Sequence, residues 1–432
     1  MRQIVFLTLA VCLLSVLAFP QTADEMAKAR SAEQLAGKAY EAKSYGEFLT
    51  QMQLANTARP NHPRLTYNLA SAYAVNGQTD AALDMLERLA KMGLYFPAEK
   101  DDDFKAMLSS ERFKSIQAKL SANRTPPNQS TKAITVADKT LLVEGVAYDK
   151  RTQTFYLASV HQRKIVAVDR NGTATDFSKE SDGLWGVFGI RVDAERGWLW
   201  VSSIANIGMK GYTEGDKGRS GIFRFDLKSG KLLKKYLLPA GERHAIGDLF
   251  IDRKGRVYAT DSASPIIYTI DQKKDEIEEF MRSDSFESLQ GLTTSAKDDS
   301  TLYVADYSKG IFRIDTATKK ITQLLPADQD MTLLGIDGLY EYRGNFIAIQ
   351  NGINPNRVAL FSVSGDKIVG YKTLEANHPD FDEPTLGVLV GDDLYFNANS
   401  QFGLLNAKGE LATDKMRSPV MLKLRLKAIS KN

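Results

Sequence analysis

The sequence predicts a mainly β fold, a six-bladed β-propeller, preceded by an N-terminal α-helical domain like a short tetratricopeptide (TPR) array. Two observations predict it: a unit of turn and strands that recurs six times in the later part of the chain, and a helical spacing of apolar residues before it. Each unit holds about four short strands, too few to bury a core alone. Six units packed around an axis bury a core together, as in a propeller.

Each unit opens on a short turn, continues into an apolar strand and, after a polar break, ends in another strand. In the first unit, residues 144–149 precede expected strands at 154–160 and 164–169, and in the last unit the final strand is expected at 402–406. The units recur at roughly 45 to 60 residues, a period typical of propeller blades. The innermost strands are expected to start at Glu144, Phe188, Gly247, Gln290, Asp337 and Thr385.

Residues 23–122 are predicted to form the TPR-like helical domain. Apolar residues recur at three- and four-residue steps over 67–93, and Gly77 separates two helices there. A weaker copy is expected at 34–60, and a third helix pair at 103–108 and 111–120 caps the stack. Two interpretations remain open: an arm that binds a protein partner, or a plain helical bundle without one.

The boundary between the two domains is predicted at a polar segment. Residues 123–132 contain Pro126 and Pro127 and read as a linker, because adjacent prolines among polar residues do not extend a helix. The propeller is then expected to span residues 133–428.

The first 18 residues have the pattern of a signal peptide. Arg2 precedes an apolar run too short to span a bilayer comfortably, and Ala18 is the small residue expected before the cleavage site. An uncleaved anchor is the alternative; a lipid anchor on Cys12 is rejected, because Val11 is bulky where a small residue is needed. The predicted location is periplasmic or secreted, without a membrane span after cleavage. Cys12 is the only cysteine, so the mature chain would have no disulfide or thiolate site.

Composition and motifs exclude several classes of function. The chain has 432 residues, of which 43% are hydrophobic, and its net charge of +3 comes from interspersed charges. No basic run indicates a nucleic-acid partner. The sequence contains no Gly-x-Ser-x-Gly nucleophile motif, no phosphate-binding glycine loop and no zinc-binding helix motif.

One mouth of the predicted channel is expected to collect oxygen ligands. Glu144, Gln290 and Asp337 start inner strands of different blades, and a closed ring points them at one axis. Such a set suits a hard divalent cation, with calcium the expected metal. The next strand of each blade is antiparallel and ends at the same mouth, so Asp261, Asn351 and Asn399 are candidate substrate-binding residues. His244 is a further candidate, as a histidine expected to reach this mouth. The alternative is that the polar residues at these strand ends only stabilise turns.

Three segments carry a resemblance to a known family: 143–149, 290–306 and 336–339. In their order and spacing they resemble the SMP-30/gluconolactonase/LRE-like family of six-bladed propellers, over about 141–426. The resemblance implies a divalent metal held by Glu144 and Asp337, with Asp337 also a catalytic base. Gln290 stands where the family has asparagine, and its amide oxygen can still coordinate. The family's substrate-contacting arginine and asparagine have no clear counterpart around 244–248.

Two functions are therefore expected from the sequence. The first is a metal-dependent lactonase or esterase acting on a small lactone or ester, in which Asp337 moves a proton. The alternative is a non-catalytic propeller that binds a ligand or a protein, with the TPR-like arm as an interaction module. Stabilisation by calcium together with lactone hydrolysis would favour the first, and metal indifference with a co-purifying partner the second.

Overall fold

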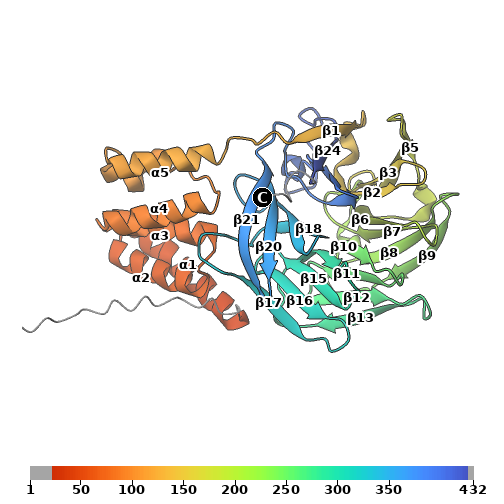
Figure 1. The fold of residues 1–432 in the computed structure, drawn as a ribbon, viewed down its shortest axis with the longest axis horizontal. Coiled ribbons are helices and arrows are strands. Elements are labelled where there is room, and N and C mark those ends of the chain that lie inside the picture. Colours follow the sequence, from red (N-terminus) through yellow and green to blue (C-terminus); the bar gives the residue numbers. More distant parts are fainter. Residues whose placement is uncertain (1–21, 427–432) are drawn as a thin grey trace, which may run out of the picture.

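The computed structural model describes residues 22–426, with a helical arm beside a ring of β-sheets (Figure 1). The predicted signal peptide at residues 1–18 and the last two residues of the predicted propeller, 427 and 428, lie outside the described residues. Within the described part, no helix is both long and apolar enough to cross a membrane.

The arm consists of two helical hairpins and a fifth helix. Its helices are α1 (Ala23–Glu41), α2 (Tyr45–Ala58), α3 (Pro63–Val75), α4 (Thr79–Lys91) and α5 (Glu111–Ala122), with the short 3₁₀ helices η1 (Ala98–Lys100) and η2 (Asp102–Met107) between α4 and α5. A capping box between Thr22 and Glu25 starts α1, and buried alanines at helical spacing let α2 pack closely against it. The helical N-terminal region is thus confirmed. The predicted helix at 103–108 is the 3₁₀ helix η2.

The ring contains six four-stranded antiparallel blades among the described residues, which confirms the propeller. Blade 1 comprises β2 (Val143–Asp149), β3 (Thr154–Ser159), β4 (Lys164–Val168) and β5 (Ala174–Asp176). Blade 2 comprises β6 (Gly186–Asp193), β7 (Trp198–Ile204), β8 (Ser220–Asp226) and β9 (Leu232–Leu237). Blade 3 comprises β10 (Ile246–Ile251), β11 (Val257–Asp261), β12 (Ile266–Ile270) and β13 (Ile277–Arg282).

Blades 4 and 5 form one eight-stranded sheet, because the outer strands β17 and β21 pair in parallel. Blade 4 comprises β14 (Leu289–Thr294), β15 (Thr301–Asp306), β16 (Gly310–Asp315) and β17 (Ile321–Pro326). Blade 5 comprises β18 (Ile336–Tyr342), β19 (Asn345–Gln350), β20 (Arg357–Ser364) and β21 (Lys367–Ala376). Apolar side chains of neighbouring blades pack together throughout the ring.

The last blade joins both ends of the ring. Blade 6 comprises β22 (Gly387–Val390), β23 (Asp393–Asn397), β24 (Val420–Arg425) and, as its outer strand, β1 (Ser130–Thr135). β1 therefore begins inside the predicted linker 123–132. The buried carboxylate of Glu375 holds the start of β1 in place. It accepts hydrogen bonds from the backbone N–H groups of Asn128 (3.2 Å), Gln129 (2.9 Å) and Ser130 (2.7 Å).

The prediction of a strand at 402–406 is wrong. Residues Phe402–Leu404 form a short 3₁₀ helix, η6, and β24 takes the expected place in the blade. The apolar residues of this loop pack over blades 1 and 2, with the Phe402 ring 6.4 Å from that of Phe188. The apolar pattern therefore reflects burial of a loop at the channel mouth.

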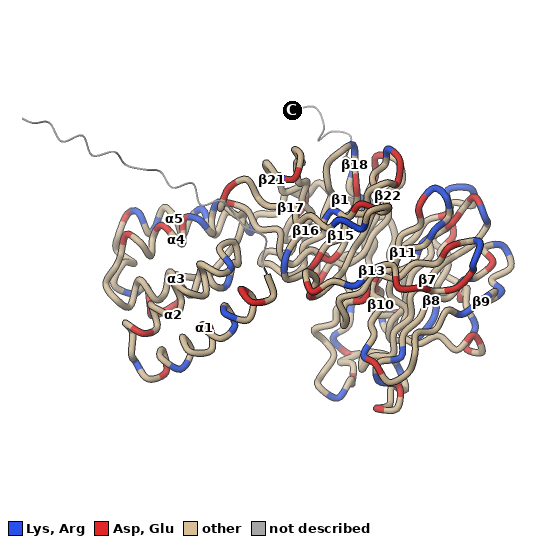
Figure 2. Tube along the Cα trace, turned by 90° about the horizontal axis from the view of Figure 1, so that it is seen from below, with Lys and Arg blue, Asp and Glu red and all other residues tan. Residues whose placement is uncertain are grey.

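The arm is docked on blades 4 and 5 of the ring (Figures 1 and 2). Ile353 of blade 5 belongs to the apolar core of the arm. The buried guanidinium of Arg357 donates to the backbone oxygen of Met92 at the end of α4 (2.8 Å), and Arg59 of the arm donates to the backbone oxygen of Ser308 (2.6 Å). Figure 2 shows both signs of charge interspersed along arm and ring, without a long run of one sign.

Candidate functional site

In five blades, the pairing of the inner strand with the second strand is irregular at the predicted channel mouth. Their register with the second strand shifts at Val143/Val146, Val187/Ile190, Ile246/Asp248, Leu289/Leu292 and Ile336/Gly338. These β-bulges contain Glu144, Gln290 and Asp337. A bulge bends the strand and re-aims its side chains, so the same local device places all three at corresponding positions in the ring.

A glycine follows the mouth residue in most blades, because neighbouring inner strands approach closely. A Cβ on Gly145 would come within 2.3 Å of the backbone oxygen of Phe188, and one on Gly291 within 2.5 Å of that of Asp337. Blade 3 instead carries Asp248, which is buried and pairs with Arg191 of blade 2 at 2.9 Å. The sequence analysis missed this ion pair, although an aspartate at a glycine position of the repeat was a visible signal.

Glu144 is a buried carboxylate with an unsatisfied oxygen. Its residue is 8% exposed, and Oε2 has no hydrogen-bond partner among the described residues. Burial, followed by the charges of Asp337, Glu383 and Asp248, raises the pKa of Glu144 well above its usual range. An orphaned carboxylate oxygen in such a place is costly unless a proton or a cation satisfies it.

Asp337 is the second buried carboxylate of this mouth, and two polar side chains position it. The Nδ2 group of Asn351 donates to Asp337 Oδ2 at 2.7 Å, and the Tyr307 hydroxyl donates to Asn351 Oδ1 at 3.0 Å. Burial raises the pKa of Asp337 to about 7, against the opposing effect of the Asn351 hydrogen bond. The predicted base and one predicted substrate-binding residue, Asn351, are therefore in direct contact.

The side chains at this mouth offer oxygen atoms, the ligands that a hard cation prefers. Glu144 and Asp337 offer oxygen ligands, and a cation between them would remove both the orphaned atom and the repulsion of two carboxylates. The Gln290 amide oxygen lies over Gly247, 3.7 Å from where a Cβ would stand, and no hydrogen bond joins it to either carboxylate among residues 22–426. That part of the chain holds no group of three or more His, Cys, Asp or Glu side chains arranged for a metal.

Glu383 is a further carboxylate near this mouth that the sequence analysis did not single out. It lies in the loop before β22, with a left-handed backbone (φ 63°), and its charge acts on both Glu144 and Asp337. Burial, followed by the charge of Asp382, raises the pKa of Glu383. Nothing in the local sequence indicated this proximity, because it depends on the path of a loop.

Polar side chains at the ends of the second strands serve a repeated structural purpose. Each hydrogen-bonds the loop that leads into the inner strand of its own blade. The bonds run between Ser159 and Leu141 O, Ser203 and Trp185 N, Asp261 and Ala245 N, Asp306 and Glu287 N, and Gln350 and Leu334 O. Asp261 is thus one of these loop anchors.

The other candidate substrate-binding residues are also bonded within their blades. His244 Nδ1 lies 2.8 Å from Asp261 Oδ2, and both side chains are buried in blade 3. Asn399 donates to the Ser418 backbone oxygen (3.0 Å) and accepts from the Val420 N–H (2.8 Å). Among the described residues none of the three is hydrogen-bonded to Glu144 or Asp337.

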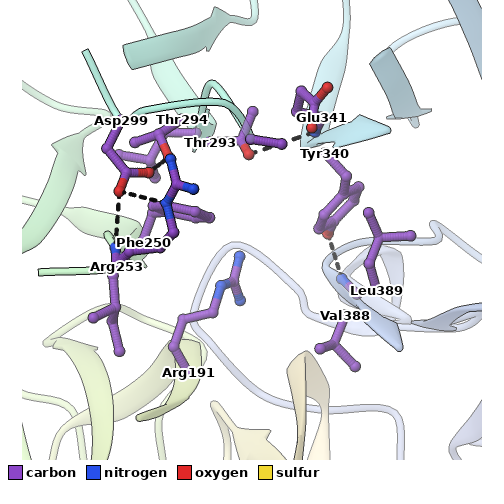
Figure 3. Close-up of a pocket in the computed structure, with 14 residues that line it drawn as sticks. Arg191, Phe250, Arg253, Thr293, Thr294, Asp299, Tyr340, Glu341, Val388 and Leu389 are labelled. Carbon is purple, nitrogen blue, oxygen red and sulfur yellow. Dashed lines mark hydrogen bonds and ion pairs between the residues drawn. The ribbon is translucent and has the colours of Figure 1, made fainter. Parts of the chain in front are cut away.

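A cavity of about 380 Å³ lies at the opposite mouth of the channel, where the inner strands end (Figure 3). Arg191 points into it, and its rim carries an Arg253–Asp299 ion pair of 3.0 Å. Tyr340 closes one side, where its hydroxyl accepts the Gly387 N–H. Both arginines are neutralised by carboxylates, which sets this cavity apart from the carboxylate-rich mouth.

No protein-family model and no curated protein matches the sequence. Solved structures do match it. A gluconolactonase from Xanthomonas campestris is 17% identical, with 70% of this chain and 92% of that chain covered and a TM-score of 0.46. The calcium-binding protein regucalcin from Agrobacterium tumefaciens is 16% identical (68% and 93% covered, TM-score 0.47). Virginiamycin B lyase from Staphylococcus aureus is also 16% identical (61% and 80% covered, TM-score 0.43). Proteins of the kind that the sequence resemblance named are thus among the matches, and the three names together select no single activity.

Proposed function

We propose that this protein is a divalent-cation-dependent hydrolase of a small lactone or ester, with calcium as the expected metal. The observation that carries the proposal is the pair of buried carboxylates, Glu144 and Asp337, at one channel mouth, with Glu144 Oε2 unpartnered. In this account Glu144 and Asp337 hold the cation, and Gln290 contributes its amide oxygen. A cation bound by oxygen ligands polarises a substrate carbonyl and makes water a better nucleophile.

The protein's own residues supply proton transfer and positioning. Asp337 takes a proton from the water that attacks the carbonyl carbon. The carbon–oxygen bond to the leaving alkoxide then breaks, and Asp337 returns the proton to that oxygen. A buried carboxylate that a side-chain hydrogen bond holds in place can accept this proton and return it. Asn351 fixes the orientation of Asp337, and Tyr307 fixes that of the Asn351 amide.

The experiment that tests this function is a hydrolysis assay on a panel of lactones and 4-nitrophenyl esters. We expect turnover with calcium and its loss with chelator. Asp337→Asn should lower kcat by about 10²- to 10⁴-fold. Asp315→Asn is the matched control, because Asp315 only caps an exposed turn through Thr318. Absence of hydrolysis across the panel would contradict the proposal and favour a ligand- or protein-binding propeller.

Export and a protein-binding role of the arm are also proposals. The leader-like residues 1–18 support export to the periplasm or the medium, with cleavage after Ala18. A protein that retains Met1 in an extracytoplasmic fraction would contradict cleavage, as mass spectrometry can establish. A TPR-like partner-binding role finds support in exposed apolar side chains on the arm, of which Leu54 is 56% exposed.

A further inference from the structure

A second cavity lies between the arm and the ring, and its wall includes Asn351, the hydrogen-bond partner of the candidate catalytic residue Asp337. Its volume is about 550 Å³. The arm contributes Arg59 and His62 from the turn between α2 and α3 and Arg64 from the first turn of α3, and the ring contributes Tyr307 and Asn351. A pocket of this size suits a small ligand. Because both domains line it, its contents would depend on how the arm is docked.

Two hydrogen-bonded side chains of the cavity wall connect it to the carboxylate site. Tyr307 and Asn351 line it, and Asn351 donates to Asp337 Oδ2 at 2.7 Å. The ring of Tyr307 can lie there because Gly352 has no side chain: a Cβ on Gly352 would come within 2.6 Å of the Tyr307 ring. A molecule in this cavity would therefore lie close to Asp337.

The arm side of the cavity carries a cation without a counter-ion. Arg59 donates one hydrogen bond, to the Ser308 backbone oxygen (2.6 Å), and its Nε is buried without an acceptor. The charges of Glu287, Glu33 and Asp306 act on Arg59, yet among the described residues no carboxylate lies within the 4 Å of an ion pair with it. A partly buried, unpaired guanidinium is unfavourable unless an anion joins it.

The other side chains around the cavity complete its chemistry. Arg64, paired with Glu33 at 2.7 Å, is a second cation of the lining, and none of the described lining residues is acidic. His62 is neutral, because burial and the neighbouring arginines lower its pKa to about 3. Apolar side chains from both domains form the remaining walls: Leu94, Phe96, Leu334 and Ile353. The lining thus fits an apolar body that carries an anionic group.

We propose that this cavity binds the distal part of the substrate and that Arg59 recognises an anionic group on it. The substrate class is then an anionic lactone or ester, whose reacting carbonyl lies at the Asp337 end and whose carboxylate or phosphate lies at the arm end. This inference rests on the proposed function for the reacting end alone. It also gives the arm a role: the arm supplies a specificity-determining residue to a site on the ring.

Two pairs of probes of equal chain length test the proposal. Glutarate and valerate differ by one carboxylate, and their mono-4-nitrophenyl esters offer the same comparison during hydrolysis. Calorimetry of the full chain with calcium should show glutarate bound about tenfold more tightly than valerate, as one charge-assisted hydrogen bond allows. Arg59→Gln should abolish that preference and raise the KM of the glutarate ester about tenfold at unchanged kcat, and Arg59→Lys should restore part of it.

Lys91→Gln is the matched control, because Lys91 also joins the arm to the ring, through Asp330 (3.4 Å), but does not line the cavity. It should keep the glutarate preference, and melting temperatures of all variants check their folding. Equal binding of glutarate and valerate by the wild type, or a preference that survives Arg59→Gln, overturns the proposal. Preference for glutarate without hydrolysis of either ester would support the assignment of the cavity and contradict the hydrolase. Hydrolysis without a preference for glutarate would support the hydrolase and contradict the assignment of the cavity.

Discussion

Asp337 combines three properties that separate it from the many aspartates of this ring. It lies in a β-bulge of an inner strand, it is almost fully buried, and its carboxylate receives a side-chain hydrogen bond from Asn351. Asp315, by contrast, caps an exposed turn, and Asp261 binds the loop of its own blade. Position in the bulge therefore separates Asp337 from these two aspartates. Its neutral partner, Asn351, separates it from Asp248, which also lies at a bulge but is paired with Arg191.

The raised pKa of Asp337 predicts a pH dependence of stability for the metal-free protein. The folded protein holds this proton up to a pKa of about 7, whereas an aspartate in the unfolded chain loses it near 4. The stabilisation is then complete below about pH 4 and is lost as the pH rises through about 7. In chelator, the free energy of unfolding should fall by on the order of 2 to 4 kcal/mol between pH 4 and pH 8.

Asp337→Asn provides the comparison that isolates this effect, because asparagine is nearly isosteric and does not titrate. Buried groups remote from Asp337, such as His62, titrate in both proteins and cancel in the difference. Glu144 does not cancel, because the charge of Asp337 contributes to its raised pKa, so the difference reports the pair of carboxylates. Denaturant unfolding at several pH values measures it. Parallel pH profiles for wild type and variant would contradict the assigned burial of the Asp337 charge.

Some of these residues could be predicted from the sequence and others could not. Glu144 and Asp337 could, because the repeat aligns the starts of the inner strands. Asp261 and Asn399 also lie at or just after recurring strand ends, and His244 lies in the loop before β10, but each is hydrogen-bonded inside its blade. Whether such a side chain faces the channel or its own loop depends on backbone geometry that the repeat does not encode.

At the scale of elements, apolar periodicity predicted strands well where they lie inside a blade. It failed at 402–406, where an apolar loop packs over Phe188 instead of pairing in a sheet. It also missed that residues 130–132 begin β1, because the polar, mostly exposed outer strand of blade 6 has no buried face to give an alternating pattern. Pairing with β24 gives these residues their strand conformation.

The contact between helix α4 and strand β20 yields a prediction about the arm. Arg357 is fully buried, and its Nε donates to Gln350 (2.7 Å) while Nη1 donates to the backbone oxygen of Met92 (2.8 Å). Arg357→Met leaves both acceptors buried without a donor. We expect a loss of about 2 to 4 kcal/mol in the free energy of unfolding and faster proteolysis near residues 123–129, measured by denaturant titration and limited trypsin digestion.

Arg425→Met is the control for this prediction, because Arg425 forms an exposed ion pair with Asp393 on blade 6. It should leave the unfolding midpoint nearly unchanged. If Arg357→Met proved as stable as this control, the hydrogen bonds of Arg357 would contribute nothing measurable to holding the arm on the ring.

At the scale of the whole molecule, the sequence predicted a helical arm and a six-bladed ring but not the interface between them. Ile353 completes the apolar core of the arm, and three arginines (Arg59, Arg88 and Arg357) bind backbone oxygens across the boundary. Such contacts join residues that lie about 240 to 270 positions apart in the sequence, so no local sequence pattern predicts them. The arm thus closes one side of a cavity beside the carboxylates of the ring.

The proposed chemistry depends on a divalent cation that Glu144 and Asp337 would hold at the channel mouth. The most direct measurement is thermal unfolding of the full chain in chelator and then with increasing calcium. We expect the wild type to gain about 2.7 kcal/mol when calcium is a hundredfold above its dissociation constant. Asp337→Asn should weaken that gain and, because it removes carboxylate repulsion, should melt higher than the wild type when both are free of metal. Melting of the wild type that is unchanged by chelator and by added calcium, magnesium, manganese or zinc would contradict the account.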